Sequence, residues 1–153
     1  MAKFTVSNLN RFLALKLPSA YLSGIRLTKI SDSQASASVK HRWINQNPFR
    51  SLYWATQGMA AELATGILVM KKIDDSREKL SMLVVKQEGE FFKKATGRIV
   101  VNCDQGQIID QTLKDAIATG EGQLMVLKSA GYDEENEMVS EFGFTWSIKC
   151  KAR

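Results

Sequence analysis

The chain has little of several residues on which small enzymes and metal proteins often depend. Its 153 residues include two cysteines and one histidine, with no Cys-x-x-Cys pair and no Cys/His cluster. This composition indicates neither a zinc site nor a disulfide framework. His41 lies between Lys40 and Arg42 with no Asp or Ser pattern nearby, which is weak support for a catalytic triad. A glycine-rich phosphate loop is also missing. We expect no metal and no resident cofactor.

Long hydrophobic runs are lacking too. No stretch reaches the roughly 20 uninterrupted apolar residues that a membrane span needs. The longest candidate, residues 52–70, contains Gln57 and Glu62 and is rich in small residues. The N-terminus has no apolar segment of signal length followed by a small-residue cleavage site. We therefore expect a cytoplasmic, reduced protein without a membrane span, in which Cys103 and Cys150 are small apolar core residues.

The charge is positive but dispersed, because 21 Lys and Arg residues alternate with 16 Asp and Glu residues along the chain. The densest basic clusters are Lys40-His41-Arg42 and Lys93-Lys94. Clusters of this size are usually solvated, so no nucleic-acid partner is expected. The basic excess would equally suit an acidic small molecule such as a coenzyme.

One stretch organises the rest of the chain: a polar segment, residues 45–51, followed by a long apolar helix predicted over residues 51–72. Apolar side chains recur there at spacings of three and four around most of the circumference, which indicates a buried helix. Glu62 is the single carboxylate in its middle. A stripe of small residues shares one face, where another backbone or a ligand could approach. That stripe comprises Gly58, Ala61, Glu62, Thr65, Gly66 and Val69.

The flanking sequence predicts two further helices and about six strands. One amphipathic helix lies within residues 1–20 and ends at Pro18, and another precedes Thr119-Gly120. In the second strand, Ser36 and Ser38 are expected on a solvated face. The predicted strands cover residues 24–31, 35–43, 80–86 with a continuation over 88–92, 98–104, 123–128 and 138–150. We expect one domain, 1–153, of the α+β class, with a curved antiparallel sheet wrapped round the long helix.

These residues resemble a hotdog-fold family of uncharacterised function. The resemblance rests on Asn47-Pro48-Phe49-Arg50-Ser51, on Met59-Ala60-Ala61-Glu62 with Thr65-Gly66, and on the segment 91–98. It covers almost the whole chain. That family is similar to the phenylacetic-acid-pathway type of acyl-CoA thioesterase. The resemblance implies a hotdog fold, a homodimer or homotetramer, and hydrolysis of an acyl-CoA, with coenzyme A present only as part of the substrate.

The thioesterase pattern maps onto this chain only in part. Those enzymes carry an Asn or Gln fifteen residues before a catalytic Asp or Glu, and a backbone amide eight residues before it in a His-Gly-Gly sequence. Counting back from Glu62 gives Asn47 and Trp54. Tyr53, Trp54 and Ala55 replace His-Gly-Gly, and the Trp54 side chain would crowd an amide that glycine leaves open.

A second departure follows the carboxylate, where Gly66 replaces a hydroxyl that some relatives carry, although Thr65 is adjacent. The resemblance thus implies Glu62 as general base or nucleophile, assisted by Asn47, by the Trp54 amide and by Thr65. It also implies two groups of binding residues. Candidates for coenzyme A phosphates are Lys93, Lys94 and Arg98, and candidates for substrate contacts are Tyr53, Phe49 and Gly58.

Each role has a structural alternative. Glu62 would instead pair with a basic residue or a polar group of a neighbouring subunit, Asn47 would stabilise a turn before Pro48, and Thr65 would bond a carbonyl one turn back. Tyr53 and Trp54 would be wall or interface aromatics, and the basic residues would be solvated. The corresponding functional alternative is a non-catalytic hotdog protein that binds an acyl-CoA or another lipid-like ligand.

Overall fold

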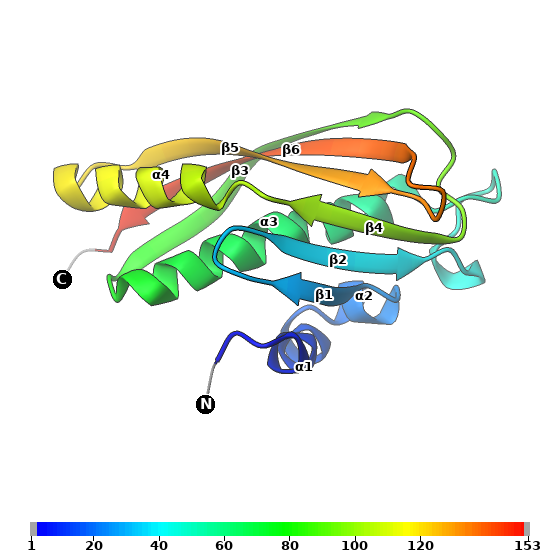
Figure 1. Ribbon diagram of the computed structural model, residues 1–153, viewed down its shortest axis with the longest axis horizontal. Helices are drawn as coiled ribbons and strands as arrows, with labels where there is room; N and C mark the ends of the chain where they lie inside the picture. The colour runs from blue at the N-terminus through cyan, green and yellow to red at the C-terminus, as the bar shows by residue number, and fades with distance from the viewer. Residues whose placement is uncertain (1–2, 152–153) are drawn as a thin grey trace.

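A computed structural model describes residues 3–151; the outermost residues of the expected 1–153 domain, including the first two of the N-terminal segment, lie outside the described range. Figure 1 shows one sheet, one long helix on its concave side and shorter helices at its margins. The helices are α1 (Val6–Lys16), α2 (Pro18–Leu22), the short 3₁₀ helix η1 (Trp43–Asn45), α3 (Trp54–Ser76) and α4 (Gly106–Thr119). The strands are β1 (Arg26–Ile30), β2 (Ala35–Lys40), β3 (Leu80–Phe91), β4 (Arg98–Cys103), β5 (Gln123–Tyr132) and β6 (Met138–Cys150).

The six strands form one antiparallel sheet in the order β1-β2-β4-β5-β6-β3. The central helix α3 contacts all six strands, and α4 packs against α3, β5 and β6. A helix that is apolar around most of its circumference needs such a cover, because a flat sheet would leave one side of it in water. The α+β class and the hotdog arrangement are confirmed.

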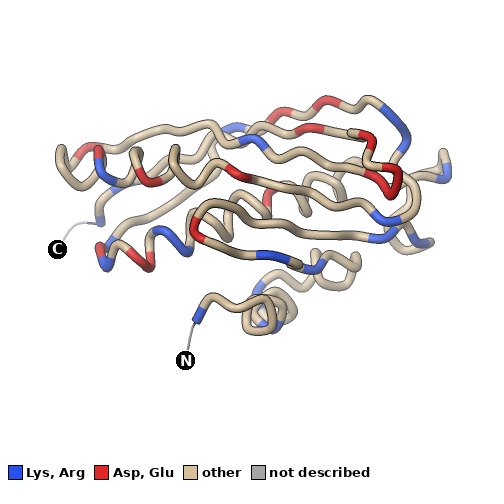
Figure 2. Tube along the Cα trace, viewed as in Figure 1, with Lys and Arg blue, Asp and Glu red and all other residues tan. Residues whose placement is uncertain are grey.

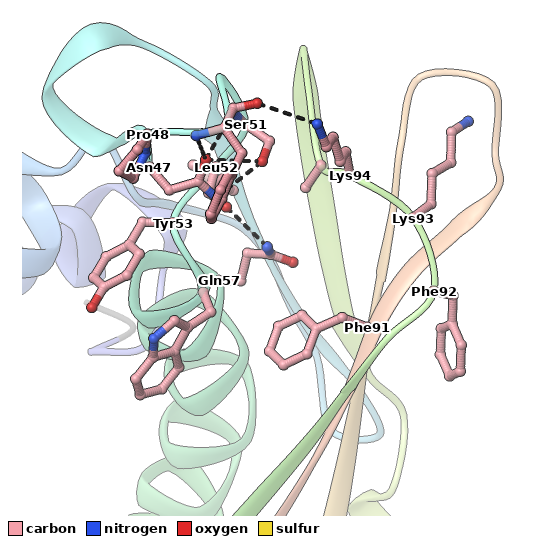
Figure 3. A pocket seen from close by; sticks show the side chains of 13 residues that line it. Asn47, Pro48, Ser51, Leu52, Tyr53, Gln57, Phe91, Phe92, Lys93 and Lys94 are labelled. Carbon is pink, nitrogen blue, oxygen red and sulfur yellow. Dashed lines mark hydrogen bonds between the residues drawn. The ribbon is translucent and has the colours of Figure 1, made fainter.

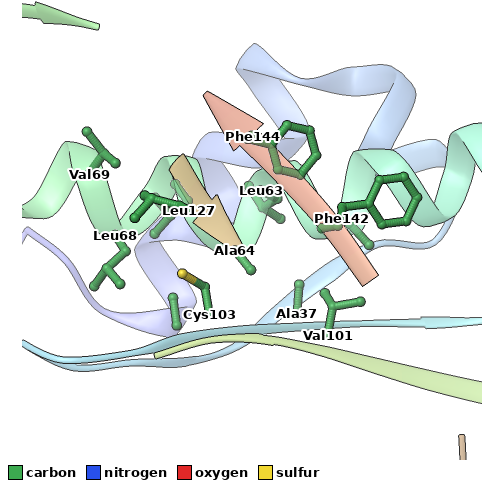
Figure 4. Packing of buried hydrophobic residues seen from close by; sticks show 14 of the residues in the cluster. Ala37, Leu63, Ala64, Leu68, Val69, Val101, Cys103, Leu127, Phe142 and Phe144 are labelled. Carbon is green, nitrogen blue, oxygen red and sulfur yellow. The ribbon is translucent and has the colours of Figure 1, made fainter. Parts of the chain in front are cut away.

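The hydrophobic core fills the space between α3 and the concave face of the sheet. Figure 4 shows Leu63, Ala64 and Leu68 of the helix close to side chains from β2, β4, β5 and β6. The alternation in β6 sends every second residue inward, and these side chains are buried. They are Phe142, Phe144, Trp146 and Ile148. The buried residues of α3 extend from Thr56 to Val69, so the core holds this part of the helix in a fixed position against the sheet.

The small-residue stripe on α3 faces the aromatic side chains of β6 at two points. A Cβ atom at Gly58 would lie 3.4 Å from the Phe142 ring, and one at Gly66 would lie 3.3 Å from the Trp146 ring. The stripe therefore lets the helix approach β6 of the same chain at these positions.

The two edges of the sheet differ. On β1, the side-chain amide of Asn10 receives a hydrogen bond from the Leu27 N–H at 2.8 Å and donates one to the Leu27 carbonyl at 2.9 Å. Asn10 of α1 thus satisfies the backbone groups of Leu27 that face away from β2 on this edge strand. On the opposite side, β3 pairs only with β6 among the described residues, so its outer edge carries unpaired backbone groups.

Several sequence-based boundaries shift. Pro18 ends α1 as expected but also begins α2, because its fixed φ suits the first helical position. Helix α3 begins later than residue 51 and continues beyond residue 72 to Ser76. The added turn is held by Lys71, which pairs with Asp75 at 2.6 Å. Within residues 3–151, no helix combines the length and hydropathy required to cross a bilayer.

Two expectations about side-chain exposure are wrong. Ser36 and Ser38 are buried, because the longer neighbours Asn102 and Arg98 of β4 cover them and share hydrogen bonds with their hydroxyls. Cys150 is exposed, since β6 extends past the core at its last residue. Cys103 is buried as expected, and burial raises the pKa of its thiol.

Candidate functional site

The loop before α3 is organised by Asn45, a residue that the sequence patterns did not single out. Its side chain is buried and donates hydrogen bonds of 2.9 Å to the carbonyls of Ser23 and Lys40. The Asn45 carbonyl also accepts a bond from the Tyr53 N–H, immediately before α3. These contacts join the end of β2, the segment after α2 and the residue before α3. They fix the entry point of the central helix.

Asn47 closes the turn that follows. Its side-chain oxygen accepts hydrogen bonds from the backbone N–H groups of Phe49 at 2.9 Å and Ser51 at 3.2 Å. Its side-chain nitrogen donates to the Ser51 hydroxyl at 3.0 Å. Arg50 completes the turn with φ of 59°, in the left-handed region. The contacts of Asn47 are those of a turn residue, the structural alternative considered for it.

A pocket of about 490 Å³ lies between this loop, the first turn of α3 and the segment after β3. Figure 3 shows Phe91 and Phe92 on one side of it and Tyr53 on the other, with Lys93 and Lys94 near its upper margin. Its walls are mainly apolar, and its volume is in the range of small-molecule sites. The lining residues are Asn47, Pro48, Phe49, Ser51, Leu52, Tyr53, Trp54, Gln57, Phe91, Phe92, Lys93, Lys94 and Ala95.

Gln57 contributes a buried polar group to the pocket wall. Its side chain is 5% exposed, and its amide nitrogen donates a 3.2 Å hydrogen bond to the Leu52 carbonyl. Its amide oxygen is buried without a donor among the described residues. In the sequence, Gln57 is only a polar interruption of an apolar run. Only the folded chain places it beside Phe91.

The first turn of α3 supplies backbone donors at the same place. No side chain caps this helix end, and the first amides of an α-helix have no partner within the helix. Tyr53 and Trp54 flank these amides and are about half exposed, with their ring centroids 5.8 Å apart. Together with the helix dipole, the free amides make this end of α3 favourable for a partial negative charge.

Glu62 lies farther along α3, outside the lining of the pocket. Its carboxylate is partly buried, and no hydrogen bond or ion pair joins it to another residue within 3–151. Burial raises the pKa of this carboxyl above its ordinary value of 4.5. One oxygen is 3.3 Å from the place that a Cβ atom on Gly66 would occupy. The glycine therefore leaves room for the carboxylate beside the Trp146 ring.

Thr65 is engaged in the core. Its hydroxyl donates to the Glu62 carbonyl at 2.9 Å, as the structural alternative expects, and accepts from the indole nitrogen of Trp146 at 3.1 Å. The residue is fully buried. Gly58 packs against Phe142 and is not a pocket residue, whereas Phe49 and Tyr53 do line the pocket.

The three basic candidates have different partners. Lys93 pairs with Asp133 at 2.7 Å and also with Glu137 and Glu135, and the first two contacts raise the pKa of its ammonium group. Within the described part of the chain, the Lys94 ammonium group contacts only the Phe49 carbonyl, at 3.5 Å. Arg98 lies outside the pocket lining. Figure 2 shows the acidic β5–β6 turn beside the basic segment that joins β3 to β4. Among these residues, Lys94 keeps the least compensated charge at the pocket.

The fold thus brings the Asn47 turn, Trp54, the Lys93-Lys94 pair and Gln57 together, but it does not bring Glu62 to them within one chain. Trp54 and Glu62 are eight residues apart on a straight helix, or about 12 Å along its axis. The small-residue stripe points Glu62 toward the β3 and β6 side of the sheet, near the open edge. Glu62 and the pocket are therefore two separate chemical features of the same helix.

Solved structures with the same architecture come from several bacteria. A Pseudomonas aeruginosa protein of unknown function, described as a probable thioesterase, is 22% identical with a TM-score of 0.82, over 95% of this chain and 96% of that one. A Chlorobaculum tepidum protein of unknown function is 15% identical with a TM-score of 0.81, over 99% of this chain and 100% of that one. A Haemophilus influenzae thioesterase is 16% identical with a TM-score of 0.72, over 97% and 93%. At these identities, the likeness shows the shared fold.

No curated protein matches the chain. A family model does match it over residues 7–148, which span every helix and strand but the first residue of α1 and the last two residues of β6. The chain therefore belongs to the family described as a domain of unknown function, DUF4442.

Proposed function

We propose that the protein hydrolyses an acyl-CoA thioester, with Glu62 as the general base. The observation that carries the proposal is the Glu62 carboxylate itself, which is partly buried and has no partner within the described chain. Burying an unpaired charge is costly, and such groups concentrate at functional sites. A carboxyl with a raised pKa is a stronger base than an ordinary one once it is ionised. The thioesterase descriptions of proteins with this fold support the same reaction class.

The developing charge on the thioester oxygen would be held at the start of α3. The uncapped amides of the first turn point toward the pocket end of the helix, where the dipole also favours negative charge. Trp54 stands where the related enzymes carry glycine, and it is half exposed on the outer side of this turn. The amide next to Trp54 is accordingly the proposed oxyanion donor, and the ring is a wall of the pocket.

Glu62 and the Trp54 amide of one chain cannot serve the same carbonyl, because about 12 Å of helix separates them. Two copies placed in opposite directions would bring Glu62 of each near the first turn of the other. The open edge of β3 supports such an arrangement, since an unpaired edge strand readily accepts a second strand. We propose that a homodimer is the functional unit. A homotetramer would additionally use the exposed apolar residues Leu124 and Val126 on the outer sheet face.

In the proposed reaction, Glu62 removes a proton from a water molecule as the water oxygen attacks the thioester carbonyl carbon. The carbonyl electrons move to the oxygen, which the helix amides hold. The intermediate then collapses and the carbon–sulfur bond breaks. The departing thiolate takes the proton from Glu62, which yields a carboxylic acid and coenzyme A. Lys94 is the proposed contact for the coenzyme phosphates. The cytoplasm is the proposed location, since a reducing compartment keeps Cys103 and Cys150 as thiols.

The test compares Glu62→Gln with the unaltered protein on acyl-CoAs of increasing chain length, with released thiol as the readout. Glu121→Gln is the matched control, because Glu121 is exposed in the turn after α4. We expect Glu62→Gln to lower kcat/KM by about a hundredfold or more, the usual contribution of a general base. The control should retain full activity. Hydrolysis that is unchanged in Glu62→Gln would refute the role of Glu62.

A second candidate is a non-catalytic protein that binds acyl-CoA or a lipid-like ligand. The contacts of Asn47 favour it, because the side-chain oxygen that would orient water already accepts backbone hydrogen bonds in its own turn. Saturable binding of acyl-CoA without release of thiol, on every chain length tested, would support this candidate over the enzyme.

A further inference from the structure

The pocket at the start of α3 contains one buried acceptor that the proposed reaction does not use. The side-chain oxygen of Gln57 is buried and has no donor among residues 3–151. His41, Ser129 and Ser140 also have buried polar atoms of this kind, but Gln57 is the one that lines the pocket. A buried polar atom without a partner is uncommon in a folded protein and calls for a cause.

The orientation of the Gln57 amide is fixed by its neighbour. Its nitrogen donates to the Leu52 carbonyl at 3.2 Å, and exchanging the nitrogen and oxygen would bring two acceptors together. The oxygen must therefore point away from Leu52. Figure 3 shows it directed into the space between α3 and Phe91. The acceptor thus lies in the inner wall of the pocket, on the side that faces Phe91, and solvent does not reach it in this structure.

The surroundings of this acceptor are apolar. Leu52, Phe91 and Phe92 line the same pocket, together with the aromatic pair Tyr53 and Trp54. Mainly apolar walls with a small number of placed polar groups are the usual design of a selective small-molecule site. A ligand that brings a donor to this oxygen satisfies a buried acceptor that is otherwise unpaired, whereas a ligand without a donor leaves it unpaired.

We propose that this pocket binds an apolar group carrying one hydrogen-bond donor, either a hydroxyl or an amide N–H, and that the Gln57 oxygen accepts this bond. Gln57 then determines specificity: it admits the donor-bearing group and discriminates against the same group without the donor. The inference rests on the proposed function only in treating the pocket as a ligand site. Its test measures binding alone, so a protein that fails to hydrolyse thioesters would leave the outcome unaffected.

The experiment uses two matched pairs of small probes on the full chain, measured by calorimetry or ligand-observed NMR. Para-ethylphenol and para-ethylanisole differ in the hydroxyl donor, and N-butylacetamide and N-butyl-N-methylacetamide differ in the amide donor. We expect the donor-bearing member of at least one pair to bind about tenfold more tightly, the effect of one satisfied buried acceptor. Preference within the first pair identifies a hydroxylated ligand, and preference within the second identifies an amide-bearing one.

Gln57→Met removes the acceptor while keeping the length of the side chain, so the preference should fall to nearly equal binding. Phe92→Leu is the control, because it trims the apolar wall and should weaken both members of a pair while keeping their ratio. Three results would overturn the proposal. These are equal binding within both pairs to the unaltered protein, a preference that survives in Gln57→Met, or no saturable binding of any probe up to about 10 mM, which even weak fragments should reach. The first and third need no variant.

Discussion

The indole nitrogen of Trp146 donates a 3.1 Å hydrogen bond to the hydroxyl of Thr65, which joins β6 to α3 inside the core. The same hydroxyl donates to the Glu62 carbonyl, so one side chain links the sheet to the turn of the helix that carries the carboxylate. The position of Glu62 thus depends on the Thr65 hydroxyl, which uses its hydrogen for one bond and accepts the other. Thr65 acts on Glu62 through the backbone.

Thr65→Val should destabilise the fold by about 1–3 kcal/mol, because it leaves the buried Trp146 N–H without an acceptor. Urea denaturation measures the change. Thr112→Val is the control, since the Thr112 hydroxyl makes an exposed hydrogen bond to the Ile108 carbonyl of the same helix, and losing this bond should cost little. The double variant Thr65→Val with Trp146→Phe should be less destabilised than the sum of the two single variants. Strict additivity would contradict the link.

Glu62→Gln should stabilise the protein at neutral pH. Burial raises the folded-state pKa of Glu62 above the ordinary value of 4.5, so between these two values the folded chain holds a proton that the unfolded chain has released. The stability that the protonated Glu62 carboxyl provides is therefore fully present below pH 4.5, and it is lost as the pH rises through the folded-state pKa. Glutamine carries no such charge, and we expect a gain of roughly 1 kcal/mol at neutral pH that disappears in acid.

Urea midpoints measured from acid to neutral pH give this difference directly. Glu121→Gln should show no comparable trend, because Glu121 is exposed. If the difference in stability between Glu62→Gln and the unaltered protein is the same at every pH, burial does not perturb the pKa of this carboxyl.

Gly106→Ala should destabilise the protein more than Gly120→Ala. A Cβ atom at Gly106 would lie 2.7 Å from the Asp32 carbonyl oxygen and 2.8 Å from the Ser33 Cα, and backbone atoms cannot move aside cheaply. Gly120 ends α4 with φ of 71° and has open space around it, so its substitution meets only the left-handed backbone cost of about 1 kcal/mol. Thermal and urea denaturation of both variants would test the order. Equal losses would contradict the close approach of α4 to the β1–β2 turn.

Lys94→Ala should weaken binding of coenzyme A by about fivefold, whereas Lys93→Ala should change it little. Lys93 is already neutralised by Asp133, Glu135 and Glu137, but Lys94 has only a carbonyl contact. Calorimetry with coenzyme A at two salt concentrations measures both variants, and the Lys94 effect should shrink at the higher one. A larger effect at Lys93 would place the phosphates on the other side of the segment.

Leu83→Lys should dissociate the proposed dimer, whereas Leu124→Lys should leave it intact. Both leucines pair with Ser147 of β6, Leu83 from β3 on one side and Leu124 from β5 on the other. They are 65% and 67% exposed. Only Leu83 is on the edge strand, where lysine is a typical obstacle to pairing with another sheet. Light scattering coupled to gel filtration gives the mass of each variant. Dissociation by Leu124→Lys alone would indicate assembly through the sheet face instead.

The sequence predicts the fold well because its signals are local. The three- and four-residue spacing in α3 and the two-residue alternation in β6 both report burial on one element. The serines of β2 show the limit of such patterns. Ser36 is polar in the sequence but buried in the fold, since a longer residue on the neighbouring strand covers it.

The candidate site is less predictable, because its residues depend on contacts between separate parts of the chain. Asn45 and Asn47 are both asparagines in one polar loop, and only Asn45 is tied by its side chain to the distant residue Ser23 as well as to the nearby Lys40. Gln57 looks like a break in an apolar run until the segment after β3 is folded against it. Glu62 was identifiable as a lone carboxylate in a buried helix, but its lack of a partner is a property of the folded chain.

The hydrogen bonds between Asn10 and Leu27 have a consequence for the size of any assembly. Asn10 occupies the backbone N–H and carbonyl of Leu27, so a strand from a second copy would have to displace this side chain in order to pair along β1. No such contact stands in the way at β3 among the described residues. Helix α1 thus disfavours edge-to-edge growth of the sheet at its β1 border.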